Sequence, residues 1–161
     1  MRALWVLALS LLLGACSARP PVPVELPALA LPQQFHVVRE QAGQRQDWLL
    51  VIQAEQGRLR WSLLDLLGIP QARQVLDGDR WQADGLLPPN PAARELFAAV
   101  LFALTPAEQL PQLYPQARPT GEGRQLDTRW QVVYRSASAF DLILGQGLRY
   151  TLEPLSTERS P

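Results

Sequence analysis

The fold is decided by residues 58–83, which read RLRWSLLDLLGIPQARQVLDGDRWQA. Over Arg58 to Leu66, apolar and polar side chains alternate, which is the period of a strand with one buried face. Turns and short strands then follow one another: the turn Gly68-Ile69-Pro70, the strand Arg73–Leu76, the turn Asp77-Gly78-Asp79 and the strand Arg80–Ala83. The Asp-Gly turn is a strong hairpin signal. These residues therefore predict consecutive antiparallel strands.

Further strand-like segments lie on both sides of this stretch, and helix signals interrupt them. The additional strands are predicted at Phe35–Arg39, Trp48–Ala54, Trp130–Arg135, Phe140–Leu144 and Leu148–Leu152. Asn90-Pro91 is a good helix start, and the apolar residues from Leu96 to Leu104 form one helical stripe. A capping box at Thr105 predicts a second short helix that ends near Leu113, followed by a loop over residues 115–125.

The order strands, helices, strands predicts an α+β fold. The expected architecture is a strongly curved antiparallel sheet with two or three helices on its concave face. A curved sheet that has no second sheet to pack against needs helices to cover its apolar inner face.

The N-terminus predicts an exported lipoprotein. Residues 3–13 (ALWVLALSLLL) follow Arg2 as an apolar run. The run is shorter than the roughly 20 residues of a membrane span, so residues 1–15 are expected to be a signal peptide. Leu13-Gly14-Ala15-Cys16 matches the bacterial lipobox, and Cys16 is the only cysteine of the chain. We expect a lipid anchor on Cys16, and Ser17 after it favours the periplasmic face of the outer membrane. The alternative is an ordinary secretory peptide.

Composition suggests one domain behind a tether. Residues 16–33 contain five prolines, which favour an extended spacer. The domain is expected over residues 34–153, and residues 154–161 are expected to be a flexible tail. The chain carries 15 basic and 15 acidic residues, so no basic surplus indicates nucleic acid.

No catalytic constellation is evident. His36 is the only histidine, and we interpret it as a half-exposed strand residue. With one histidine and an acylated Cys16, no zinc site can be built from nitrogen and sulfur ligands. Asp77 and Asp79 belong to a turn. We therefore expect no enzyme activity, no metal and no cofactor.

Several sequence segments resemble LolB, the outer-membrane receptor family that accepts lipoproteins from the periplasmic carrier LolA. Residues 64–68 (LDLLG) and 72–78 (ARQVLDG) resemble its third strand, its Pro-Leu-Gly loop and the next strand. Residues 129–134 (RWQVVY) resemble its Gly-Trp-x-Val-x-Tyr strand. The chain is also similar to a family of LolB-like lipoproteins of unassigned function, which share a Leu-Trp-Pro-type segment, here Leu113-Tyr114-Pro115.

The resemblance implies a half-barrel with a cavity for lipid and a membrane-insertion loop at Leu67 and Ile69. It also implies a LolA-like carrier as partner, and lipid or acylated cargo for a monomeric protein. The stiffer turn Gly68-Ile69-Pro70 departs from LolB, and Leu67 could instead tuck under the sheet. The predicted cavity lining is Trp48, Leu50, Ile52, Trp61, Leu63, Trp81, Phe97, Leu101, Trp130, Val132, Tyr134, Leu142 and Tyr150.

Two functions remain open at this point. In the first, the aromatic side chains line an apolar cavity, as ligand pockets commonly require. The protein would then hold an acyl chain and assist its delivery to the outer membrane. In the second, the same side chains fill an ordinary core. The protein would then be a structural or accessory lipoprotein that docks onto an envelope assembly.

Overall fold

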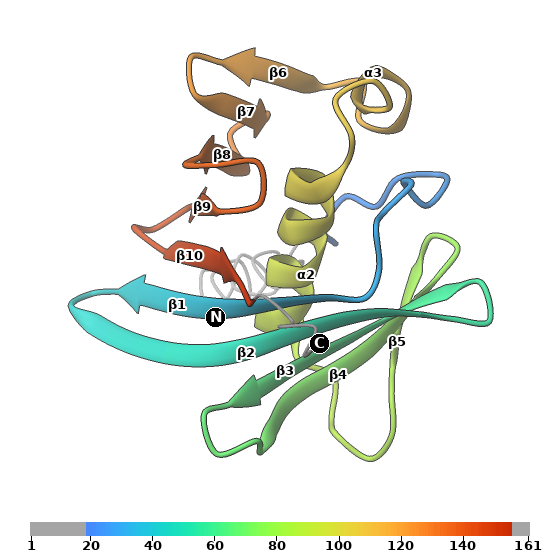
Figure 1. Ribbon diagram of the computed structural model, residues 1–161, viewed down its shortest axis with the longest axis vertical. Helices are drawn as coiled ribbons and strands as arrows, with labels where there is room; N and C mark the ends of the chain where they lie inside the picture. Colours follow the sequence, from blue (N-terminus) through green and yellow to red (C-terminus); the bar gives the residue numbers. More distant parts are fainter. Residues whose placement is uncertain (1–18, 156–161) are drawn as a thin grey trace, which may run out of the picture.

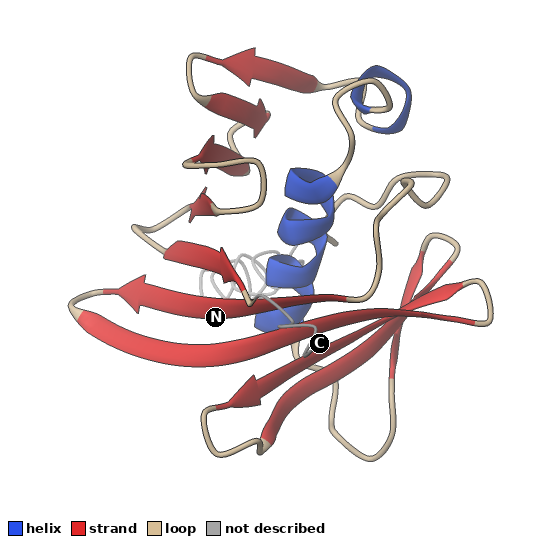
Figure 2. Ribbon diagram, viewed as in Figure 1, coloured by secondary structure: helices blue, strands red, loops and turns tan. Residues whose placement is uncertain are grey.

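A computed structural model of the chain describes residues 19–155, and the strands of this part join in one antiparallel sheet (Figures 1 and 2). The strand order is β5-β4-β3-β2-β1-β10-β9-β8-β7-β6. The strands are β1 (Gln33–Gln41), β2 (Gln44–Glu55), β3 (Arg58–Asp65), β4 (Pro70–Asp77), β5 (Arg80–Ala83), β6 (Ala117–Thr120), β7 (Gly123–Leu126), β8 (Trp130–Tyr134), β9 (Phe140–Leu144) and β10 (Arg149–Pro154). The helices are α2 (Pro91–Leu104) and α3 (Leu110–Leu113).

Short turns connect neighbouring strands, and one long-range pairing joins the two ends of the domain. Gln56 and Gly57 between β2 and β3 both have positive φ, as a tight hairpin requires. At the centre of the sheet β1 pairs with β10, with Val37 opposite Leu152. The sheet bends at this pair, so that β1–β5 and β6–β10 form two parts with α2 between them (Figure 1). We call the face toward α2 the inner face.

Helix α2 is apolar around its whole circumference. The Asn90 side chain caps its N-terminus by accepting a hydrogen bond from the Ala93 N–H at 3.0 Å. Every residue from Leu96 to Ala103 is buried. A helix of this kind must be covered on all sides. The sheet covers only one side, so a second element is needed.

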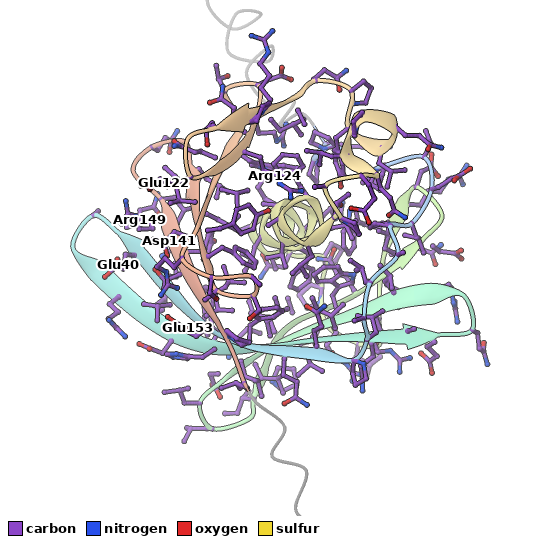
Figure 3. The ribbon with its side chains drawn as sticks, turned by 45° about the horizontal axis from the view of Figure 1, so that its top comes forward. Glu40, Glu122, Arg124, Asp141, Arg149 and Glu153 are labelled. Atoms are coloured by element: carbon purple, nitrogen blue, oxygen red, sulfur yellow. The ribbon has the colours of Figure 1, made fainter. Side chains whose placement is uncertain are left out.

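That second element is the proline-rich segment 19–32, which we call the strap. It runs along α2 on the side away from β6–β10 (Figures 1 and 3). The Ala28 N–H donates to the Gln109 side-chain oxygen at 3.0 Å. The strap side chains that pack against the core are Val22, Leu26, Leu29 and Leu31. The sequence predicts a spacer here, whereas the described part of this segment lies against the domain.

The predicted fold class, an α+β half-barrel with two or three helices covering the concave face, is wrong. Residues 19–155 are mostly a ten-stranded antiparallel sheet that is neither strongly curled nor closed. The helices are small, with 14 residues in α2 and 4 in α3, and they do not cover the sheet. The second short helix is present as α3, but it begins at Leu110 rather than after Thr105, because Thr105 does not start it. The Thr105 hydroxyl donates to the Leu101 carbonyl at 2.8 Å and thereby ends α2.

The predicted loop 115–125 is also wrong, because it contains β6 and most of β7. Pro119, Gly121 and Gly123 have low strand propensity and conceal these strands in the sequence. Gly123 is required by close packing: a Cβ atom there would lie 2.0 Å from the Val132 carbonyl oxygen. Pairing with β8 therefore overrides local propensity.

A charged cluster ties the N-terminal half of α2 to the start of β8. The Glu95 carboxylate accepts hydrogen bonds from Arg129 Nε at 2.7 Å and Nη2 at 2.6 Å. It also accepts one from Trp130 Nε1 at 2.7 Å. The bidentate ion pair and the indole bond fix the register of the helix against β8.

The aromatic core sets the stability of the domain. We expect Trp61→Ala to lower the free energy of unfolding by about 3–5 kcal/mol, because it removes a fully buried ring and leaves a cavity. Urea denaturation of the unacylated mature chain, residues 17–161, measures this change. The control is Leu86→Ala at a fully exposed site, for which a change beyond about 0.5 kcal/mol is not expected. Equal stability of the two variants would contradict the packing described.

The strap contributes to folding in the same way. A chain that starts at Gln33 is expected to be about 2–4 kcal/mol less stable than the chain that starts at Ser17, since it loses the apolar contacts of the strap with the core. Thermal and urea denaturation of the two chains measure the difference. Identical stabilities would mean that the segment is a free tether.

Candidate binding pocket and exposed apolar hairpin

All thirteen side chains that were predicted to line a cavity lie together in one hydrophobic core. Ten of them are buried, while Trp48, Trp81 and Tyr134 are partly buried. Aromatic rings fill the centre of this core. Trp61 stacks on Phe97 with ring centroids 5.5 Å apart and meets Trp81 edge-on at 5.7 Å. The middle of the interior is therefore packed.

Open space lies instead at the C-terminal end of α2. This helix-end pocket has a volume of about 510 Å³ and lies between the inner face of the sheet and the end of the helix. Among the predicted cavity residues, Tyr134 lines it. The other side chains that matter here are Phe35, Ala103, Arg124, Ser138 and Phe140. Its size is in the range of small-molecule sites, about 300–1,000 Å³.

Arg124 is the charged group of the helix-end pocket. Its guanidinium lies over the end of α2, whereas Glu40, Glu122 and Arg149 lie on the side of the sheet away from the helix (Figure 3). Arg124 Nη1 donates to the Thr105 carbonyl at 2.7 Å and more weakly to the Phe102 carbonyl at 3.3 Å. The cation thereby neutralises the negative end of the helix dipole.

Tyr134 forms the wall beside this cation. The Arg124 guanidinium lies 5.2 Å from the centre of the Tyr134 ring, within the range of a cation–π contact. The Tyr134 hydroxyl donates to the Ala103 carbonyl at 2.6 Å. Burial raises the pKa of this hydroxyl and the charge of Arg124 opposes the rise. The hydroxyl is therefore protonated at neutral pH and holds the end of α2 against β8.

Most residues that line the helix-end pocket were not predicted as site residues from the sequence. Arg124 lies in the stretch that was predicted to be a loop, so its inward direction had no signal. Phe35 and Phe140 were predicted on strands but were not assigned to a site.

The second feature is the tip of the β3–β4 hairpin. Leu66, Leu67 and Ile69 are exposed to 71%, 85% and 54%. Leu67 therefore does not tuck under the sheet. Sequence analysis assigned Leu66 to the preceding strand and missed its exposure. Three large apolar side chains on one turn form an unusual surface for a soluble domain.

The hairpin tip is held rigidly by a single carboxylate. Asp65 Oδ1 accepts hydrogen bonds from the backbone N–H groups of Leu67 and Ile69, both at 2.9 Å. Asp65 Oδ2 accepts a further bond from Gln71 Nε2 at 3.2 Å. The N–H groups of Leu67, Gly68 and Ile69 are thereby satisfied within the turn itself, and the apolar side chains are exposed.

An apolar groove lies beside the hairpin tip. It has a volume of about 540 Å³ and is lined by Trp48, Leu49, Leu66 and Leu155 among others. His36 stands at its edge and forms a 2.9 Å hydrogen bond with Asp47. Tip and groove together make a continuous apolar surface at this end of β2 and β3.

No known protein family matches the chain, and no curated protein matches its sequence. Over residues 19–155, none of the helices has the length and apolar character needed to cross a membrane. In the same part of the chain, no three His, Cys, Asp or Glu side chains gather into a possible metal site.

The class that the described residues define is a sheet domain with a buried helix, a pocket at the helix end and an apolar hairpin.

The rigidity of the tip can be tested at Asp65. Asp65→Ala removes both acceptor oxygens, so the amides of Leu67 and Ile69 are expected to exchange with solvent about tenfold faster. Asp65→Asn keeps one side-chain oxygen acceptor and is the matched control, with a smaller effect. Hydrogen exchange followed by NMR measures both. Unchanged exchange in the alanine variant would show that the turn does not depend on this carboxylate.

Proposed function

We propose that this protein is an outer-membrane lipoprotein, anchored through Cys16 on the periplasmic face, that takes up an acyl chain or similar apolar group and assists delivery of lipoprotein or lipid to the membrane without catalysis. Cys16 lies outside the described residues, so the anchor rests on the Leu13-Gly14-Ala15-Cys16 motif. The observation that carries the rest is the rigid apolar tip formed by Leu66, Leu67 and Ile69.

The energetics of the tip favour entry into a bilayer. Full burial of a leucine or isoleucine side chain is worth about 1.5–3 kcal/mol. Transfer of the three exposed side chains into hydrocarbon would therefore gain on the order of 5 kcal/mol. Asp65 already accepts hydrogen bonds from two backbone N–H groups of the turn, which lowers the cost of moving them out of water.

The helix-end pocket is the space for an apolar group. Leu104, Tyr134 and Leu155 offer apolar surface, and its volume of about 510 Å³ suits a single chain rather than a whole lipid anchor. Release requires that the membrane bind the group more tightly than the pocket does. A LolA-like carrier that brings lipid or acylated cargo is the partner that the resemblance to LolB suggests, and we propose that the protein acts as a monomer.

A specific observation favours a second candidate function. The interior beside Trp61, Trp81 and Phe97 is filled by interlocked rings, as in an ordinary core. In a non-catalytic accessory lipoprotein, the hairpin tip and its groove would then dock onto another envelope protein instead of entering lipid.

Lipid binding separates these candidates. The unacylated mature chain, residues 17–161, is purified, extracted with solvent and analysed by mass spectrometry, and a fluorescent fatty acid is titrated into a delipidated sample. Delivery predicts co-purifying lipid and saturable binding of the probe. Absence of both would support the accessory role.

The insertion role of the hairpin is tested by Leu67→Glu. A charge at the tip is expected to weaken association of the same chain with phospholipid vesicles by about 10- to 100-fold, since it removes one apolar side chain and adds a desolvation cost. Vesicle co-sedimentation measures the change. Leu86→Glu, at another fully exposed leucine outside this hairpin, is the matched control and is expected to bind like the parent. Unchanged binding of the Leu67 variant would exclude insertion through this tip.

A further inference from the structure

We infer that the helix-end pocket selects an amphiphile with an anionic head group, a carboxylate or a phosphate, which pairs with Arg124 while the apolar tail lies against Leu104, Tyr134 and Leu155. This inference deepens the proposed function and rests on it, because it names the chemical class of the group that the pocket takes.

Arg124 brings a positive charge to the helix-end pocket. Within residues 19–155, no carboxylate forms an ion pair with Arg124. Among the other partly buried arginines of the described chain, Arg60 pairs with Glu55 and Asp84, and Arg129 pairs with Glu95. Arg94 instead donates to the uncharged side chain of Gln74. A cation removed from bulk water is costly unless it is paired. The pocket therefore presents a positive charge whose anionic partner the described residues do not supply.

The hydrogen bonds of Arg124 leave room for such a partner. Both of its bonds, to the carbonyls of Phe102 and Thr105, use Nη1. Nε and Nη2 make no hydrogen bond with the described residues. A guanidinium has five N–H donors in a planar fork that matches carboxylate and phosphate oxygens. The carbonyl bonds hold the side chain in place at the pocket, and they leave the donors of Nε and Nη2 unused by the described residues.

The walls indicate what the anion carries. Leu104, Tyr134 and Leu155 give apolar surface to the lining, whereas Phe35 and Phe140 lie behind it, buried in the core. Ser138 and Gln34 add polar groups to this lining. A small inorganic anion would leave the apolar walls uncovered, whereas a head group with a hydrocarbon tail would cover them.

The test compares ligands that share a tail and differ in the head. Dodecanoate, dodecyl phosphate and the neutral dodecanol are titrated by calorimetry into the unacylated mature chain at pH 8, where the carboxylate is ionised. We expect each anionic ligand to bind at least tenfold more tightly than dodecanol. The dodecanoate arm represents a fatty acid, and the dodecyl phosphate arm represents a phospholipid head group. Inorganic phosphate alone is expected to bind at least a hundredfold more weakly than dodecyl phosphate.

Substitution of the cation gives the second readout. Arg124→Gln is expected to abolish the preference for the anionic ligands and to leave the affinity for dodecanol unchanged within about twofold. Arg124→Lys keeps the charge, so it is expected to retain part of the preference and guards against a folding defect in the glutamine variant. Arg118→Gln is the matched control, since Arg118 is exposed on the neighbouring strand β6.

The outcomes separate two kinds of failure. Dodecanol binding as tight as dodecanoate and dodecyl phosphate in the parent chain would overturn the selection of an anion and leave apolar binding intact. An undiminished preference in the Arg124→Gln variant would overturn the role of this residue. If none of the three amphiphiles binds, the pocket does not take an apolar group. The proposed function then fails together with the inference.

Discussion

Burial of the apolar surface of α2 is the constraint on which the rest of the structure depends. Between Leu96 and Ala103 the helix has no polar face, so water must be excluded from it on every side. A sheet can cover one side of a helix. The bend of the sheet at β1 and β10 places α2 between the two parts of the sheet, and the strap covers the side that the sheet leaves open (Figure 1). A helix of 14 residues thus holds together a strap and a ten-stranded sheet.

The two ends of α2 differ in their polar contacts and in their packing, and this difference creates the helix-end pocket. At the N-terminal end, Asn90 caps the backbone and Glu95 binds Arg129 and Trp130, so polar groups are satisfied within the protein. At the C-terminal end, Arg124 satisfies the helix carbonyls but retains an unmatched charge among the described residues. The packed side chains also leave an opening there. The same cation that stabilises the helix end therefore gives the pocket its chemical character.

The apolar side chains of the hairpin tip are arranged in the opposite way to those of the core. In the core, apolar side chains gather and exclude water. At the tip, Asp65 binds the backbone and holds Leu67 and Ile69 outward in water. Hydrophobic burial cannot explain this arrangement within the described chain, because the side chains remain exposed. Its stabilisation requires a second apolar surface, which in our proposal is the bilayer.

The sequence by itself determined the local structure of several elements. Alternation along Arg58 to Leu66, the Asp77-Gly78 turn and the Asn90 cap predicted strands, a hairpin and the start of α2, and the structure confirms them. Each signal depends on neighbours along the chain, which is why it can be read from sequence. The lipobox at Cys16 is of the same kind, although it lies outside the described residues.

Tertiary structure alone decided how these elements cover one another. The apolar stripe of α2 predicted one buried face, whereas contacts with the strap bury the whole helix. Gly123 and Arg124 gave no strand signal, because their strand exists only through pairing with β8. The unmatched charge of Arg124 likewise depends on distances between segments far apart in the chain. Such distances are set by packing of the whole domain, which has no local pattern in the sequence.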